Sequence, residues 1–206
     1  MASRRGAVRT GPARRLSAAP SLVDVQLRIE LQHLTPLIWR RVRVAEAVTL
    51  ATLHRILQAA MGWTDSHLHE FEIARRRYGM PDDDNDWPES EPLSDERRAR
   101  LQSFVEARVR RFHYTYDFGD NWQHVVKIED LVPRGTDQPL ATCIAGENRC
   151  PPEDVGGAHG YVEFLGIVKN ARHPEHADML TWAGGPFNPT EFDMKIVNRR
   201  LAYITR

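Results

Sequence analysis

The sequence predicts an α+β domain in which a mainly antiparallel sheet of about five strands packs with four or five helices. Three observations lead to this prediction. Apolar and polar residues alternate strictly in several stretches, apolar residues recur at helical spacing in others, and short turns join most consecutive strands. The sequence has no repeat of roughly 20–50 residues, which argues against solenoid and propeller architectures.

Two strands and a helix are expected where the ordered sequence begins. Apolar and polar residues alternate over residues 23–32, and a second strand is predicted over residues 38–44. Thr49 suits the N-cap of a helix whose apolar stripe ends at Met61, and Gly62 follows as a helix terminator. This helix is expected to pack on the sheet.

A third strand, an acidic loop and a second helix follow. Residues 67–73 alternate again, which would place His67 and His69 on one strand face. The stretch 81–94 is rich in acidic residues and contains Pro88 and Pro92 as well as Pro81, so it is predicted to be a surface loop. Ser94 is then expected to cap a helix.

Two aromatic and β-branched runs on either side of residues 119–121 predict a β-hairpin. A two-residue turn would place Asp117 opposite His124, whereas a longer loop would shift the register and separate the two side chains. A region rich in Pro and Gly follows and is interpreted as an ordered loop. Three more helices are expected, one around Tyr161, one from Pro174 and one from Asn188.

Composition limits the class of protein. The chain has 206 residues, of which 41 % are hydrophobic and 27 % charged, and this excludes a wholly disordered, collagen-like or disulfide-scaffold protein. No apolar run approaches the length that spans a membrane, so no membrane partner is expected. The 28 basic and 28 acidic residues balance over the whole chain, but not along it.

The N-terminal segment is basic. Residues 1–21 precede the first acidic residue, hold Gly and Pro and lack a large apolar face, so they are expected to form a disordered tail ahead of one domain, residues 22–206. Such a tail suits weak contact with nucleic acid, while a transit peptide and a solubilising extension are the alternatives. Its basic residues are Arg4, Arg5, Arg9, Arg14 and Arg15.

Two motifs carry a resemblance to a known family. Residues 114–124 read YTYDFGDNWQH and residues 150–157 read CPPEDVGG, with further matches at residues 37–40, 67–71 and 191–193. Over about residues 22–205 the chain resembles the plasmid pRiA ORF-three-like family, to which insertion-element passenger TnpR-like domains are related. The resemblance implies an α+β fold and an association with bacterial plasmids or mobile elements, but no reaction.

The same two motifs supply a candidate polar site. Its members offer carboxylate oxygens, an imidazole and an indole, and the carboxylates and imidazole would suit a divalent cation if the hairpin meets the proline-glycine loop. The structural alternative is that the acids bond the local backbone in turns and caps, and that the tryptophan is a packing anchor. The candidate residues are Asp117, Asp120, Trp122, His124, Glu153 and Asp154.

Further metal ligands are available from two histidines and two cysteines. His67 and His69 are candidates if their shared strand face is exposed. Cys143 and Cys150 have six residues between them, which is less diagnostic than a Cys-x-x-Cys pair, and two buried thiols are the alternative. Many relatives carry Cys where Val155 stands, so the resemblance does not favour a cysteine-based site.

The hypothesis from the sequence is a cytoplasmic accessory or interaction module with a protein partner, which touches nucleic acid weakly through the tail and through Arg40, Arg41 and Arg43. The alternative is a metal-dependent hydrolase or nuclease that uses the hairpin and loop carboxylates to hold a water-activating cation. Clustering of those acids in a concave site would favour the second hypothesis.

Overall fold

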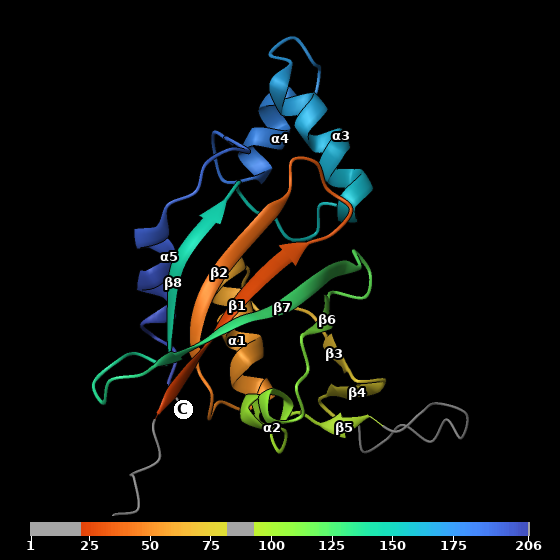
Figure 1. Cartoon of the computed structure of the whole chain (residues 1–206). Helices are drawn as coiled ribbons and strands as arrows, with labels where there is room; N and C mark the ends of the chain where they lie inside the picture. Colours follow the sequence, from red (N-terminus) through yellow and green to blue (C-terminus); the bar gives the residue numbers. More distant parts are fainter. Residues whose placement is uncertain (1–21, 82–92, 206) are drawn as a thin grey trace, which may run out of the picture.

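The computed structural model describes residues 22–81 and 93–205, and it has the α+β class that the sequence predicts (Figure 1). In these ranges one sheet has the strand order β5-β4-β3-β6-β7-β1-β2-β8. The strands are β1 (Val23–Leu31), β2 (Ile38–Ala45), β3 (His69–Ile73), β4 (Arg76–Gly79), β5 (Ser94–Asp95), β6 (Arg111–Tyr116), β7 (Trp122–Pro133) and β8 (Ala141–Glu147).

The sheet is larger than the predicted five strands. Eight strands are found within the described residues, and β4 pairs with β5 in parallel, so the sheet is mixed. The strands that the sequence did not reveal lack a clear period of two: β4 and β5 have four and two residues, and β8 lies in the region rich in Pro and Gly.

Strand β1 is central, because it pairs antiparallel with β2 on one side and β7 on the other. Every second side chain of β1, from Val25 to Leu31, is fully buried, while Gln26, Arg28 and Glu30 on the opposite face are only partly buried. The alternation seen in the sequence therefore separates a core face from a polar face.

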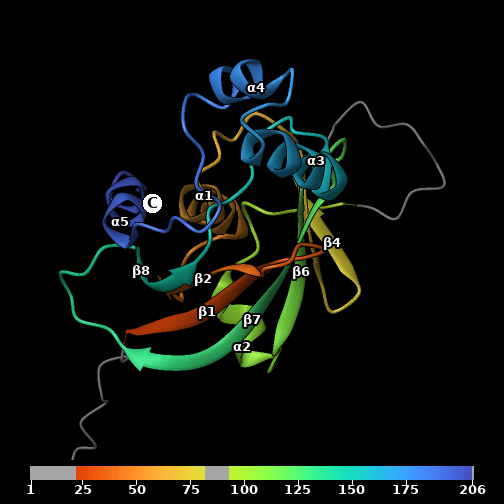
Figure 2. The same ribbon diagram turned by 90° about the horizontal axis from the view of Figure 1, so that it is seen from above.

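Helix α1 (Leu50–Met61) has the ends that its capping residues predict. The Thr49 hydroxyl accepts a hydrogen bond from the Thr52 amide at 3.2 Å, and Gly62 ends the helix with φ of 98°. Its buried residues join the core with the inward strand residues. Figure 2 shows α1 and α5 (Met194–Leu201) on one side of the sheet.

Helix α2 (Leu101–Glu106) begins later than expected. The prediction that Ser94 caps it is wrong, because Ser94 pairs with β4 as part of β5 and the N-cap is Arg100. Most of the predicted acidic loop, residues 82–92, lies outside the described residues.

Helices α3 (Gly157–Lys169) and α4 (His176–Trp182) lie together beyond one end of the sheet (Figure 1). The last helix, α5, begins at Met194 rather than near Asn188, because Asp193 is its N-cap and the Asp193 carboxylate accepts from the Lys195 amide at 2.7 Å. No helix in the described ranges combines the length and the apolar character needed to cross a bilayer.

Helix α5 also protects the outer edge of the sheet. The Asn198 side chain accepts a hydrogen bond from the Cys143 amide at 2.8 Å and donates one to the Cys143 carbonyl at 2.9 Å. These two bonds satisfy backbone groups that an edge strand would otherwise expose for pairing.

Candidate functional site

The β6–β7 hairpin ends in a five-residue loop that Asp117 organises. Tyr116 pairs with Trp122, so residues 117–121 connect the strands. Asp117 adopts a left-handed backbone with φ of 56°. Its Oδ1 accepts from the amides of Gly119 at 2.9 Å and Asp120 at 3.3 Å. This local bonding leaves Oδ2 directed away from the turn.

The two-residue turn is therefore wrong, and the longer loop shifts the register as the alternative required. His124 lies opposite Tyr114 rather than Asp117. Both Trp122 and His124 are 1 % exposed and pack on Trp63, with ring centroids 5.9 and 5.4 Å away. Burial lowers the pKa of His124 to about 4, so the imidazole is neutral near pH 7.

The hairpin contacts the proline-glycine loop, as expected. The Gly156 amide donates to Asp120 Oδ2 at 3.2 Å. Gly157 has φ of 67°, and a Cβ there would overlap the Asp120 carbonyl oxygen. The close approach of the two backbones thus depends on a glycine at this position.

Glu153 fixes the rest of the loop. Its carboxylate accepts from the Tyr116 hydroxyl at 2.6 Å, and from the amide and the hydroxyl of Thr64 at 2.9 and 2.5 Å. Burial is the larger cause and the hydrogen bond to Glu153 the smaller, and both raise the pKa of Tyr116. Its hydroxyl therefore remains a donor at ordinary pH. Because Glu153 already has these three donors, we assign it to holding the loop rather than to coordinating an ion.

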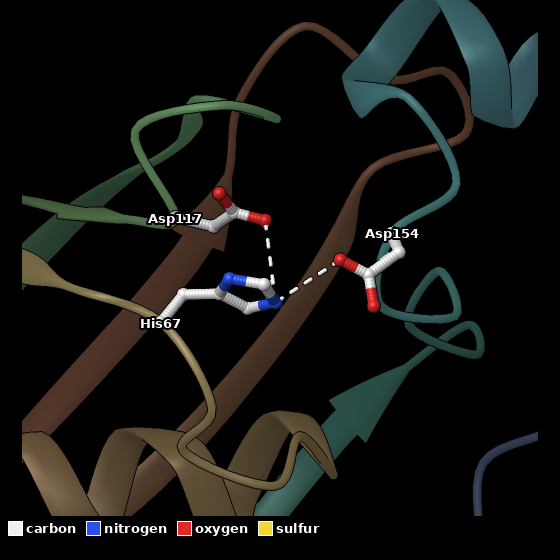
Figure 3. A group of neighbouring side chains, drawn as sticks. All are labelled: His67, Asp117 and Asp154. Carbon is white, nitrogen blue, oxygen red and sulfur yellow. Dashed lines mark ion pairs between the residues drawn. The ribbon is translucent and has the colours of Figure 1, made fainter.

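His67 stands between two carboxylates (Figure 3). Its Nε2 lies 3.1 Å from Asp154 Oδ1 and 3.7 Å from Asp117 Oδ2. One ligand atom from each of these residues lies within 4.8 Å of the others. Asp154, like Asp117, has a left-handed backbone, with φ of 60°. Two non-glycine residues in this sparsely populated region therefore aim their carboxylates at the same imidazole.

Exposure differs among the three side chains. The Asp117 side chain is 10 % exposed, that of His67 29 % and that of Asp154 70 %. The cluster thus has a protected side on the hairpin and an open side on the loop. A cation held there would keep coordination positions for water.

The other predicted metal ligands point elsewhere. His69 is buried in the core, where its Nε2 lies 2.7 Å from Glu96 Oε2 and its ring stacks on His54 at 3.4 Å. Cys143 and Cys150 are buried free thiols, and burial raises the pKa of both. Neither His69 nor the cysteines belong to the cluster around His67.

The buried pair of His54 and His69 was not anticipated. His54 also contacts the Tyr114 hydroxyl at 2.7 Å and Asp65 Oδ1 at 2.5 Å, and burial, with the neighbouring His69, lowers its pKa to about 4. The available signal was a histidine directly after Leu53 in the apolar stripe of α1.

The strand arginines do not form one basic surface. Arg40 is 3 % exposed and donates to four backbone carbonyls, those of Trp39, Ala60, Glu147 and Asn148. It is therefore a structural residue, and the sequence prediction that it touches nucleic acid is wrong. Arg41 lies on the opposite face and pairs with Glu129 at 2.6 Å.

Comparisons with known proteins agree with the motifs. The family model described as plasmid pRiA4b ORF-3-like protein matches residues 24–196. The uncharacterized protein y4hQ of Sinorhizobium fredii is 42 % identical over 161 residues, which cover 78 % of this chain and 80 % of that protein. A crystal structure of the protein of unknown function MM3350 from Methanosarcina mazei has a TM-score of 0.77 and 37 % identity, and covers 85 % of this chain and 97 % of that one.

Proposed function

The chain belongs to the plasmid pRiA4b ORF-3-like family, and on the basis of its polar cluster we propose that it is a cytoplasmic accessory module that binds one divalent cation. The ligands proposed are Nε2 of His67 and one carboxylate oxygen each from Asp117 and Asp154. One imidazole and two carboxylates suit Zn²⁺ or Mn²⁺ better than Ca²⁺, which prefers oxygen ligands alone.

The observation that carries the proposal is the state of His67 Nε2. This atom is shielded from solvent and has no hydrogen-bond partner among the described residues, although Asp154 Oδ1 is only 3.1 Å away. A hydrogen bond would need the oxygen on the axis of the ring N–H. An ion would itself occupy that axis, with the carboxylate oxygens beside it.

The spacing of the ligand atoms agrees with this arrangement. Metal–ligand bonds of about 2.1 Å place adjacent ligand atoms about 3.0 Å apart at right angles and about 3.4 Å apart in a tetrahedron. The distances from His67 Nε2, 3.1 Å to Asp154 and 3.7 Å to Asp117, are close to these values. Small movements of the two carboxylates would complete the site.

A bound cation would connect three segments of the chain: the residues before β3, the β6–β7 hairpin and the proline-glycine loop. Binding to the folded state alone stabilises a protein, by about 3 kcal/mol at a hundred-fold excess over the Kd. The proposal concerns binding. Hydrolysis by the ion, the enzymatic alternative from the sequence, has no observation of its own in its favour.

Calorimetric titration of the protein with Zn²⁺ and Mn²⁺ tests the proposal. Asp154→Asn removes a ligand at an exposed position. Altering an outer-shell partner of a metal already costs about 10- to 100-fold in affinity, so loss of a direct ligand should weaken binding more than about ten-fold. Asp137→Asn, at another exposed aspartate, is the matched control and should bind like the unaltered protein. The proposal fails if the unaltered protein binds neither ion, or if Asp154→Asn binds equally well.

The basic tail is a separate matter. Its five arginines lie outside the described residues, so contact with nucleic acid is proposed from their charge and from the lack of acidic residues before Asp24. Deletion of the tail, described below, tests this contact independently of the cation.

A further inference from the structure

A cleft of about 310 Å³ is lined in part by the proline-glycine loop, through Cys150, Pro151, Pro152 and Glu153. It lies between the end of α1, that loop and the segment that leads into α5, and Trp63, Phe187, Phe192 and Ile196 supply apolar walls. This volume is at the lower end of the range of small-molecule sites. The cleft shares Glu153 with the loop, but none of the three proposed cation ligands lines it.

Six charged side chains line the cleft, and five of them are engaged. Arg40 is occupied by backbone carbonyls, Glu153 by Tyr116 and Thr64, and Asp193 by the first amides of α5. Arg149 pairs with Glu191 at 3.2 Å. Arg200 is the sixth: in the part of the chain that the structure describes, its side chain has neither a hydrogen bond nor an ion pair.

Arg200 is held at the cleft by a close approach to Gly62. The guanidinium lies against the glycine backbone, where a Cβ would overlap its Nη1. Gly62 ends α1, so the positive charge is near the carbonyl end of that helix, which favours it. The guanidinium thus has a defined position while its donors remain available.

Two guanidinium groups act together on the sulfur of Cys150, which lines the cleft. Burial raises the pKa of the Cys150 thiol, but Arg40 and Arg200 both act in the opposite direction by favouring the thiolate. The two guanidinium groups therefore reinforce each other at the sulfur. An anion that entered the cleft would meet the available donors of Arg200.

We propose that this cleft binds a small organic carboxylate, with the carboxylate on Arg200 and the apolar body against the walls formed by Trp63, Phe187 and Phe192. Guanidinium and carboxylate match in shape and form two parallel hydrogen bonds. Flat apolar groups pack well on aromatic side chains. This site is distinct from the proposed cation site and does not depend on it.

Titration with benzoate, followed by NMR at the side-chain N–H signals of Arg200, tests the proposal on the full chain. Benzamide has nearly the same shape without the charge and should bind about ten-fold more weakly or worse. Arg200→Met should reduce benzoate affinity by a similar factor. Arg199→Met, at the neighbouring exposed arginine that does not line the cleft, should leave the affinity unchanged.

Thermal unfolding of both variants separates loss of binding from loss of folding. Arg200 is exposed, and the favourable position of its charge at the end of α1 is worth under about 1 kcal/mol, so Arg200→Met should unfold within about 4 °C of Arg199→Met. The proposal is overturned if benzoate does not bind, if benzamide binds as tightly, or if Arg200→Met retains the original affinity. Loss of binding in Arg199→Met to the same degree would also overturn it, because the effect would then reflect general charge.

Discussion

Acid should destabilise this protein through His124, because that side chain is buried in the neutral form. It is 1 % exposed, and burial lowers the pKa of its imidazole to about 4. Nδ1 donates to the Tyr114 carbonyl at 3.2 Å, while Nε2 has no hydrogen-bond partner among the described residues. Protonation would place an uncompensated charge in the core.

The size of the effect follows from the two pKa values. The unfolded chain takes up a proton on His124 near pH 6.5, whereas the folded protein resists it until about pH 4. The folded protein therefore keeps its full stability above about pH 6.5 and loses stability as the pH falls from about 6.5 to about 4. Linkage gives a loss of about 2 kcal/mol near pH 5, and of about 3 kcal/mol once the window is crossed.

Urea unfolding of the protein and of His124→Phe, at about pH 7.5 and about pH 5, measures this pH-dependent loss in the free energy of unfolding. The substitution costs stability at both pH values, but the pH-dependent loss should be about 2 kcal/mol smaller in the variant. His54 contributes the same pH dependence in both proteins, so its contribution cancels when the two are compared. His113→Gln, at an exposed histidine, should behave like the unaltered protein. Equal pH dependence in His124→Phe would refute the reasoning.

Three further predictions concern other parts of the chain. Arg40→Met should cost about 3 kcal/mol or more in urea unfolding, because four backbone carbonyls lose the charged donor of a buried side chain, whereas Arg41→Met at a surface ion pair should cost under about 1 kcal/mol. Gly157→Ala should lower the thermal midpoint through overlap and a left-handed backbone, while Gly166→Ala, in a helix with open space around it, should raise stability by up to about 1 kcal/mol. Deleting residues 1–21 should leave the thermal midpoint unchanged and remove duplex DNA binding. For the full-length protein, fluorescence anisotropy against salt should give a log–log slope of affinity of about −4.

The elements that the sequence predicts well are those with dense local signals. Strict alternation defines β1, and Thr49 and Gly62 define α1, because a cap and a left-handed terminator act within one turn of the helix. By contrast, β5 has two residues and is a strand only because β4 lies beside it. Its pairing is a tertiary contact that no local pattern of two residues can indicate.

The candidate site was predicted in part for the same reason. Asp117 and Asp154 come from turn-rich motifs whose residues favour left-handed backbones, and the sequence shows these motifs directly. His67 and His69 were expected to share a strand face. That expectation is wrong because β3 begins only at His69, so the period of two does not extend back to His67. One imidazole enters the core, and the other reaches the carboxylates.

The segment from Cys150 to Gly156 contributes to both the proposed cation site and the proposed carboxylate cleft. Cys150 accepts a hydrogen bond from Arg40 at 3.3 Å, the Pro151 carbonyl accepts one from the Trp63 indole at 3.0 Å, and Gly156 donates to the hairpin. Within this segment Pro151, Pro152 and Glu153 line the cleft, and Asp154 Oδ1 lies 3.1 Å from His67 Nε2. Because its own backbone and side chains supply the anchors, the loop is ordered before any ligand arrives. Binding at either site then requires little further ordering, which is the cost that most weakens ligand binding by loops.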